Sequence, residues 1–326
     1  MKIAHLITGS IFAGIEQHVY ELAQSLNKKT SQIIICGSHI QEHLHKVDHE
    51  TIELGSRYSP INILKLKKFV KQNDVDILHC HGSKSSTVGS LLRLFDSIKI
   101  VSTVHGHKKA SNSVIKKSHA VIGVNKKLIN GIENAVFIPN WFNPAHQGIP
   151  SSRSGPILAI GRLEKVKGFD LLIRSWINID KPLEIIGSGQ EEKSLSALIK
   201  SHGLEKKIKI ITNYSYTSIE EKYKSASGLI ISSLREGGPR VVLEAINHDI
   251  PILGTKVGIL PQLISQEFLV EPNNQEKLQK LIEEMLPLFP QMNMAGLKNQ
   301  IHENYSIESA SQATLNIYES LLRADS

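Results

Sequence analysis

Short runs of apolar and β-branched residues recur along the chain, separated by stretches with helical periodicity. Runs that are apolar at nearly every position are typical of strands buried on both faces of a parallel sheet. Repeated alternation of strands and helices predicts βαβ units and an α/β, doubly wound architecture. The predicted strands span residues 3–8, 32–36, 76–80, 99–104, 120–124 and 136–139, then 157–161, 183–187, 208–212, 228–232 and 250–254.

This alternation is interrupted once, over residues 143–156, where Pro, Gly and Ser replace the periodic pattern. Such a composition indicates an interdomain linker. The chain has 326 residues, a length that suits two domains better than one. We therefore predict two Rossmann-like domains that face each other across a cleft, over residues 1–145 and 155–305, followed by a helix in 306–326.

The charge is distributed unevenly between the two predicted domains. Residues 1–150 hold 18 Lys and Arg against 10 Asp and Glu, and 12 of the 15 His, whereas the rest of the chain holds 20 against 21. The basic character of the first half indicates an anionic partner there, such as nucleic acid, an anionic membrane surface or a phosphorylated ligand.

The cysteines and the N-terminal residues indicate in which cellular compartment the protein resides. Cys36 and Cys80 each end an apolar run, and two lone thiols argue against a disulfide framework or a structural zinc site. The first ten residues lack the order of a signal peptide, and no apolar run reaches the length of a spanning helix. We expect a cytoplasmic protein.

A glycine turn with basic residues follows the strand at 157–161. Gly161 and Arg162 come first, and Lys167 follows five residues after Arg162. A guanidinium and an ammonium on one loop can converge on a diphosphate. A solvated basic loop is the alternative interpretation.

A second constellation follows the strand at 228–232. Gly237 and Gly238 precede a predicted helix, whose free N–H groups and positive dipole end form a site for phosphate. Glu236 lies before this helix and Glu244 lies inside it, so both carboxylates can accept hydrogen bonds from sugar hydroxyls beside the phosphate. The alternative is that Glu236 caps the helix and Glu244 is an ordinary helix carboxylate.

These residues together resemble the C-terminal domain of a retaining GT-B glycosyltransferase of the family 4, or group 1, type. The resemblance rests on Gly161-Arg162, Lys167-Gly168, Gly187-Ser188-Gly189, the Glu236 and Glu244 pair with Ala245, and then Pro251, Gly254, Gly258 and Leu260-Pro261-Gln262. Their order and spacing match over about 110 residues. In this fold the last helix commonly crosses back to the first domain.

The resemblance implies roles for the catalytic groups of the second domain. Arg162 and Lys167 neutralise the diphosphate of a sugar nucleotide. Glu236 holds hydroxyls of the donor sugar, and Glu244 holds the ribose. No metal and no other cofactor is expected, because the basic side chains take over the phosphate charge.

The resemblance also implies the donor contacts of the backbone and the base. The turns at Gly161 and Gly187 let the chain approach the nucleotide. The base lies against residues 212–216, which include Tyr214. The amides that serve sugar and phosphate oxygens belong to Gly237, Gly238, Arg240 and Val241. Many relatives have a glycine where Pro239 stands, and because proline has no N–H, one donor to the sugar or phosphate is missing here.

The first domain supplies further candidates. The segment that contains Gly9 and Gly14 resembles the family's N-terminal loop, which usually has two adjacent glycines before a helix. Only Gly14 remains of that pair here, and its backbone is expected to approach the phosphate or the acceptor. His105 matches a family histidine that points at the donor sugar, and His81 would face the same cleft. A packed or merely exposed histidine is the alternative for His105. A zinc site of His79, His81, His105 and His107 is rejected, because no carboxylate or Cys accompanies them at ligand spacing.

Two basic segments lie in the first domain. Residues 61–71 are predicted to form an amphipathic helix with a lysine face, and residues 106–118 form a second basic patch. Such runs are usually solvated faces, but the charge excess favours contact with an anionic leaflet. Nucleic acid is not expected as a partner, since no recognition motif accompanies the charge.

The predicted function is retaining transfer of a hexose or N-acetylhexosamine from a nucleotide sugar to a hydroxyl of a surface-glycan or lipid-linked acceptor. A UDP-sugar is expected as the donor, because uridine donors are the most frequent. A peripheral position at the inner face of the plasma membrane is expected. Two alternatives stay open: a sugar-nucleotide epimerase or hydrolase of GT-B fold, and an inactive GT-B protein that acts as a membrane-bound partner. An epimerase or hydrolase would convert the donor with no acceptor present.

Overall fold

The structure is a computed structural model that describes residues 1–9, 12, 14–56, 58–106, 115–142 and 153–323. It divides into two compact units. Unit 1 comprises Met1–Trp141 together with Ile307–Ser326, and unit 2 comprises Phe142–Ser306. The last helix of the chain therefore belongs to the same unit as the first strand.

Unit 1 is built on a seven-stranded parallel sheet with the order β3-β2-β1-β4-β5-β6-β7. Its strands are β1 (Lys2–Leu6), β2 (Ser31–Cys36), β3 (Asp48–Thr51), β4 (Ile77–His81), β5 (Lys99–Val104), β6 (Ala120–Gly123) and β7 (Ala135–Phe137). Its described helices are α1 (Gly14–Leu26), α2 (Pro60–Gln72), α3 (Ser83–Leu92) and α12 (Ile307–Arg323), with short 3-10 turns at Ser38–His43 and Lys126–Leu128. The strand order reverses between β1 and β4, which is where ligands of doubly wound sheets bind.

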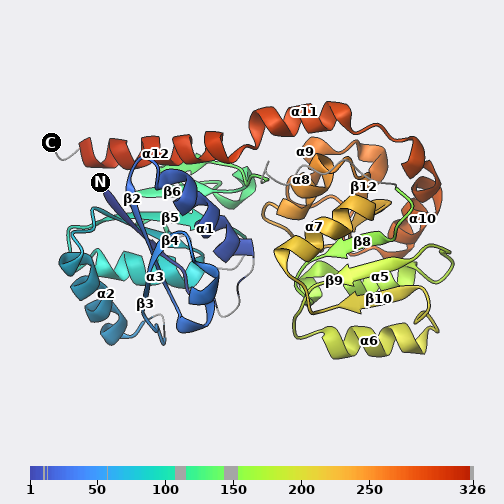
Figure 1. Cartoon of the computed structure of the whole chain (residues 1–326), viewed down its shortest axis with the longest axis horizontal. Helices are drawn as coiled ribbons and strands as arrows, with labels where there is room; N and C mark the ends of the chain where they lie inside the picture. Colours follow the sequence, from blue (N-terminus) through green and yellow to red (C-terminus); the bar gives the residue numbers. More distant parts are fainter. Residues whose placement is uncertain (10–11, 13, 57, 107–114, 143–152, 324–326) are drawn as a thin grey trace. The chain divides into compact units, whose positions relative to one another are not determined.

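Helices cover both faces of this sheet (Figure 1). Alternate residues of each strand point to opposite faces, so Ile3 packs with α1 and α12 whereas Ala4 packs with α2 and α3. Helix α12 contributes the buried side chains of Leu315 and Tyr318 to the first of these cores. The C-terminal helix is thus an integral layer of unit 1.

Unit 2 repeats the architecture with a six-stranded parallel sheet in the order β10-β9-β8-β11-β12-β13. Its strands are β8 (Ile157–Ile160), β9 (Leu183–Ile186), β10 (Ile208–Ile211), β11 (Gly228–Ile231), β12 (Ile252–Thr255) and β13 (Leu269–Val270). Its described helices are α5 (Phe169–Ser175), α6 (Glu192–Ser201), α7 (Tyr216–Ser225), α8 (Arg240–Asn247), α9 (Leu260–Leu263), α10 (Gln275–Met285) and α11 (Ala295–Asn304), with 3-10 turns at Lys165–Lys167, Gln266–Phe268 and Leu286–Gln291. One core packs α8, α9 and α11 on the sheet, and the other packs α5, α6 and α10.

The predicted α/β architecture of two doubly wound domains is confirmed. Each predicted strand coincides with an observed one to within two residues at either end. Two strands were missed, β3 and β13. The first is an exposed edge strand of sequence Asp-His-Glu-Thr, and the second has only two residues, so neither carries an apolar run.

Helix α2 forms where the lysine-faced helix was predicted. The second basic patch falls largely on residues 107–114 and the predicted linker largely on 143–152, and both stretches lie outside the described residues. Among the described helices, none combines the length and the apolar character needed to cross a bilayer.

Candidate functional site

The loop after β8 brings Lys167 back over the end of its own strand. The amide of Gly161 donates to the carbonyl of Ile186 at 2.9 Å, which ties this turn to β9. A Cβ atom at Gly161 would lie 3.0 Å from Cε of Lys167, so the lysine side chain passes directly over the glycine. The turn at Gly161 therefore leaves room for the ammonium group at the carboxyl edge of the sheet.

Gly187 stands at the equivalent point after β9. A Cβ atom there would lie 1.8 Å from the carbonyl oxygen of Gly161, a distance that no side chain tolerates. The amide of Gly187 donates to the carbonyl of Ile211 at 3.0 Å. The two glycine turns are thus pressed backbone to backbone across neighbouring strands, and glycine is required because of this approach.

Lys167 forms an ion pair with Glu236. The distance from Nζ to Oε1 is 2.6 Å, and the hydroxyl of Ser233 donates to the same carboxylate oxygen at 2.7 Å. The two charged side chains are 17% and 13% exposed, so water screens their interaction only partly. The pair joins two loops that are 69 residues apart in the sequence and that follow the adjacent strands β8 and β11.

Helix α8 begins at Arg240, directly after the Gly237-Gly238-Pro239 turn, so Arg240 and Val241 supply the first amides of the helix. Glu244 lies one turn inside the helix, where Oε2 accepts the hydroxyl hydrogen of Tyr223 at 3.0 Å. Its Oε1 lies 4.0 Å from Nε of Arg240. The helix thus presents amide donors at its tip and an oriented carboxylate behind them.

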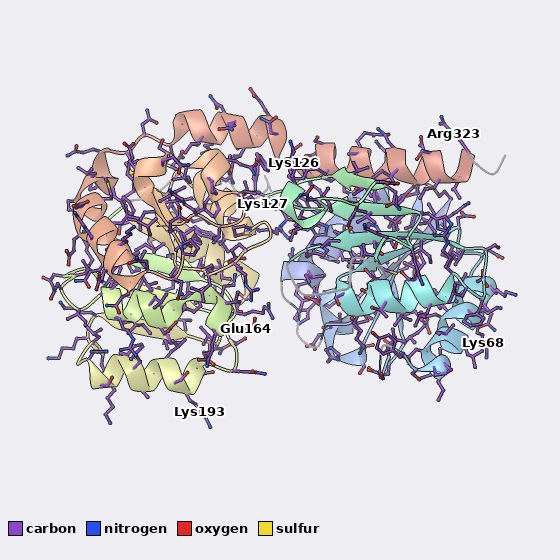
Figure 2. The ribbon with its side chains drawn as sticks, turned by 180° about the vertical axis from the view of Figure 1, so that it is seen from behind. Lys68, Lys126, Lys127, Glu164, Lys193 and Arg323 are labelled. Atoms are coloured by element: carbon purple, nitrogen blue, oxygen red, sulfur yellow. The ribbon has the colours of Figure 1, made fainter. Side chains whose placement is uncertain are left out.

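The remaining candidates of unit 2 lie on loops at the same sheet edge. Arg162 pairs with Glu164 on its own loop, and its side chain is 47% exposed. Tyr214 lies on the loop between β10 and α7 and is also exposed. Figure 2 marks Glu164 on the loop that follows β8. Arg162 thus lies on the predicted loop, but it pairs with Glu164, whereas Lys167 pairs with Glu236.

The glycines predicted in unit 1 flank the start of α1. Gly14 is the first residue of the helix and is exposed. The carbonyl of Gly9 accepts a hydrogen bond from Nε2 of His39 at 2.7 Å. A Cβ atom at Gly9 would lie 1.9 Å from Oε1 of Glu16, so the carboxylate of α1 lies against the glycine.

His81 and His105 belong to a larger cluster of histidines on one face of the unit 1 sheet. His81 Nδ1 lies 3.4 Å from His105 Nε2, and His81 Nε2 lies 3.1 Å from His5 Nδ1. His79 contacts the hydroxyls of Tyr318 at 2.5 Å and Thr103 at 2.7 Å. His5 was not predicted, although a single polar residue inside the apolar run of the first strand was the signal for it.

Ring nitrogens of this cluster come close enough together to be considered as metal ligands. The described residues offer two such groups, His5 with His79 and His81, and His18 with His81 and His105. Both nitrogens of His79 are engaged by hydroxyl groups, and Nε2 of His5 is engaged by the side chain of Gln32 at 2.7 Å. In the first group, His5 and His79 are therefore held by hydrogen bonds with described side chains.

An Asp-x-Asp triplet can also hold a divalent ion, and the chain contains one, Asp74-Val75-Asp76. It lies at the amino end of β4, where Oδ2 of Asp76 accepts the amide hydrogen of Lys2 at 2.7 Å. Ligands of open α/β sheets bind at the carboxyl ends of strands. The triplet therefore belongs to a turn at the amino edge of the unit 1 sheet, whereas His81 lies at the carboxyl end of the same strand.

The buried histidines predict that acid destabilises the protein. Burial lowers the pKa of His5 to about 4, and burial lowers the pKa of His79 and of His81 well below the usual range. The unfolded chain, with pKa values near 6.5, binds these protons first, so stability is fully present above about pH 6.5 and is lost as the pH falls toward 4. Each such group costs about 1.4 kcal/mol per pH unit in this window.

Thermal unfolding between pH 7.5 and pH 4.5 measures this effect. The melting temperature is expected to stay level above pH 7 and to fall steeply below pH 6. The variant His79→Gln is expected to have a shallower fall, whereas His45→Gln, at an exposed position, keeps the full slope. A melting temperature that is constant down to pH 4.5 contradicts the neutral state of the cluster.

Two family models match the chain in succession. The model described as Glycosyltransferase Family 4 matches residues 12–156, and the model described as Glycosyl transferases group 1 matches residues 147–296. Together they cover most of unit 1 and nearly all of unit 2. The second match contains every candidate of unit 2 named above, from Gly161 to Glu244.

Known proteins agree with these matches. An uncharacterised glycosyltransferase of Methanocaldococcus jannaschii is 25% identical over 98% of this chain and 99% of its own length. The N-acetyl-alpha-D-glucosaminyl L-malate synthase of Bacillus anthracis is 23% identical over 75% of this chain and 76% of its own. Among solved structures, Anabaena HepE in complex with UDP and glucose superposes with a TM-score of 0.84 at 17% identity, covering 98% of this chain and all of HepE. The fold, the succession of family matches and these relatives show that the chain belongs to the group 1 glycosyltransferases of GT-B fold.

Proposed function

We propose that this protein transfers a hexose or an N-acetylhexosamine from a UDP-sugar to a hydroxyl group of a surface-glycan or lipid-linked acceptor, with retention of the anomeric configuration. Unit 2 binds the donor, and unit 1 binds the acceptor. The donor's diphosphate is neutralised by basic side chains of the protein, with no metal ion required.

The observation that carries this proposal is the Lys167–Glu236 pair at the carboxyl edge of the unit 2 sheet. The two side chains lie on the loops after β8 and β11, the two strands at which the strand order reverses. An ammonium, a sugar-facing carboxylate and a helix tip are complementary to the diphosphate and hydroxyls of a sugar nucleotide. Glu244, oriented by the hydroxyl of Tyr223, adds an acceptor for the ribose hydroxyls.

The proposed reaction breaks the bond between the anomeric carbon and the β-phosphate oxygen of the donor. The electron pair leaves with the diphosphate, and Lys167, Arg162 and the amide donors of α8 stabilise the developing charge. The acceptor oxygen forms its bond to the anomeric carbon on the same face. Its proton passes to an oxygen of the leaving phosphate.

The choice of donor follows the names of related proteins. The relatives include the Bacillus anthracis synthase named above and a phosphatidylinositol N-acetylglucosaminyltransferase component of Arabidopsis thaliana, which is 22% identical over 96% of this chain and 80% of its own. Both names specify N-acetylglucosaminyl transfer or an N-acetylglucosaminyl product. HepE has been solved with UDP-glucose, which favours a uridine donor in this fold.

A panel of UDP-, GDP- and ADP-sugars tests this proposal. We expect a UDP-sugar to raise the melting temperature most and mass spectrometry to detect a product only when a glycan or lipid-linked acceptor is added. Conversion of the donor without acceptor would favour the epimerase or hydrolase alternative. Nucleotide-dependent stabilisation with no product from any acceptor would favour an inactive partner protein.

Membrane contact forms a second part of the proposal, because the outer face of α2 combines charge with exposed apolar side chains. Ile61 and Leu64 are 63% and 66% exposed, and Lys65 and Lys68 follow them on the same face of the helix. Figure 2 labels Lys68 on α2. Apolar side chains beside lysines are typical of helices that lie in the interface of an anionic bilayer. We place the protein at the cytoplasmic face of the plasma membrane on this ground.

Sedimentation with vesicles of neutral and anionic phospholipid tests this contact. The double variant Ile61→Ser/Leu64→Ser is expected to weaken binding to anionic vesicles at least about tenfold, since burial of each side chain contributes on the order of 1 kcal/mol or more. The double variant Lys193→Gln/Lys200→Gln, on exposed positions of α6 in unit 2, serves as control and is expected to bind as the wild type does. Equal binding by both double variants would remove α2 from the proposal.

A further inference from the structure

The loops after β8 and β11 are joined by backbone contacts as well as by the ion pair between Lys167 and Glu236. The amide of Leu234 donates to the carbonyl of Val166 at 2.8 Å, and the hydroxyl of Ser232 donates to the carbonyl of Lys167 at 2.9 Å. Ser232 directly follows β11 and is 2% exposed, so little water competes for its hydrogen bond. These two bonds therefore hold the two loops together at the backbone.

Ser232 contacts the backbone of Lys167 and Gly168 with both its hydroxyl and its carbonyl group. A Cβ atom at Gly168 would lie 2.3 Å from the carbonyl oxygen of Ser232, so this oxygen occupies the place of a side chain. Gly168 also has a φ of +63°, in the left-handed region that favours glycine. The glycine after the lysine is thus required for the close packing of Ser232 against this part of the backbone.

The loop that carries Ser232 also holds the other end of Lys167. The hydroxyl of Ser233 donates to Oε1 of Glu236 at 2.7 Å, and the same oxygen pairs with Nζ of Lys167. The carbonyl of Ser233 accepts the hydroxyl hydrogen of Thr255, at the end of β12, at 2.7 Å. Lys167 is therefore held at its carbonyl by Ser232 and at its ammonium group by the carboxylate that Ser233 orients.

The two ends of Lys167 respond differently to a bound diphosphate. Phosphate oxygens compete with Glu236 for the ammonium group, so the ion pair alone does not fix the lysine once a donor is bound. The hydrogen bond from Ser232 involves neither charged group and persists. Because the lysine side chain is long and flexible, its reach depends on a backbone that stays in place.

We propose that Ser232 is a positioning residue that holds the backbone of Lys167, so that the ammonium group meets the leaving diphosphate without movement of the loop. The catalytic consequence rests on the proposed function, whereas the contact between the two loops does not. A charge that is already in place stabilises a transition state without the cost of reorganisation.

Two serines at opposite ends of β11 provide a matched pair of variants. The hydroxyl of Ser227, just before the strand, donates to the carbonyl of Gly155 at 2.7 Å, and this serine is 7% exposed. Ser232→Ala and Ser227→Ala each remove one buried hydroxyl that donates to a backbone carbonyl, so we expect similar decreases in melting temperature. Only Ser232→Ala releases the backbone of Lys167.

Hydrogen–deuterium exchange of the donor-free protein tests the contact between the loops. We expect the Leu234 amide to exchange as slowly in the wild type as the amides inside β11, and about tenfold faster in Ser232→Ala but not in Ser227→Ala. Rapid exchange in the wild type, or unchanged exchange in Ser232→Ala, would overturn the proposal. If Ser232→Ala does not fold, Ser232→Cys takes its place, because a thiol of similar size donates only weakly.

Steady-state kinetics with a saturating acceptor test the positioning role. Ser232→Ala is expected to lower kcat about tenfold and to change the donor KM less than about threefold, whereas Ser227→Ala keeps the wild-type kcat. The double variant Ser232→Ala/Lys167→Ala is expected to be no slower than Lys167→Ala, since Ser232 acts through the lysine. A further tenfold loss in the double variant would overturn the positioning role.

The two experiments distinguish failure of this inference from failure of the proposed function. The predicted exchange rates together with an unchanged kcat in Ser232→Ala would overturn the positioning role in an active transferase. The predicted exchange rates in a protein that transfers no sugar from any donor would contradict the proposed function and leave the contact between the loops established.

Discussion

Replacing Lys167 with alanine is expected to lower turnover by about 10²–10³-fold, as for the loss of one donor that stabilises charge in a transition state. The ammonium lies over the turn at Gly161 and is paired with Glu236 at 2.6 Å. In the proposed reaction it compensates the charge that develops on the leaving diphosphate. Because that charge is greatest in the transition state, kcat is expected to fall more than the donor KM rises.

Steady-state kinetics with a saturating acceptor provide the measurement. Lys165→Ala is the matched control, because Lys165 is an exposed lysine on the same loop, two residues away. Its activity is expected to stay within a few-fold of the wild type. The melting temperatures of both variants show whether removal of the ion pair has unfolded unit 2. A folded Lys167→Ala enzyme with activity close to that of the wild type would show that the catalytic assignment is wrong.

Replacing Gly187 with alanine is expected to disturb both stability and donor binding. The added Cβ would lie 1.8 Å from the carbonyl oxygen of Gly161, so one of the two backbone turns has to move. Such overpacking costs about 1–3 kcal/mol in the free energy of unfolding. The turn that must move also supports Lys167, so affinity for UDP is expected to fall together with stability.

Denaturant unfolding and UDP titration of the same variant measure the two effects. Gly296→Ala is the matched control in unit 2, because a Cβ at this exposed position on α11 meets nothing within 4 Å. Alanine there is expected to be neutral or to stabilise the helix by up to about 1 kcal/mol. Equal stability and equal UDP affinity of Gly187→Ala and Gly296→Ala would contradict the close approach of the two turns.

The fold was largely predictable because most of its strands are buried on both faces. Continuous apolar runs such as 120–124 in unit 1 and 157–161 in unit 2 are typical of parallel strands between helical layers. Strand β3 was not predictable in this way. All four of its side chains are exposed, so its pairing with β2 depends on backbone hydrogen bonds at a sheet edge.

The candidate site was predictable where its residues follow strands and not where they meet by tertiary packing. Glu236 and Lys167 each follow a predicted strand, but their ion pair across 69 residues depends on the order of the strands in the sheet. The hydroxyl of Tyr223 that orients Glu244 comes from the last turn of α7, and nothing in the sequence of this helix sets Tyr223 apart from its neighbours.

The contact between His5 and Gln32 was missed for a similar reason. His5 and Gln32 are single polar residues in apolar strands, and each looks unremarkable by itself. Their strands are 25 residues apart in sequence but adjacent in the sheet, and this adjacency turns two isolated side chains into a hydrogen-bonded pair.

A crystal structure of the protein with UDP tests the central claim most directly. The account predicts that the diphosphate lies within hydrogen-bond distance of Nζ of Lys167 and of amide nitrogens at the start of α8, with the ribose against Glu244. A crystal structure in which UDP is bound elsewhere would contradict the account. So would a structure without bound UDP at UDP concentrations that saturate the thermal shift.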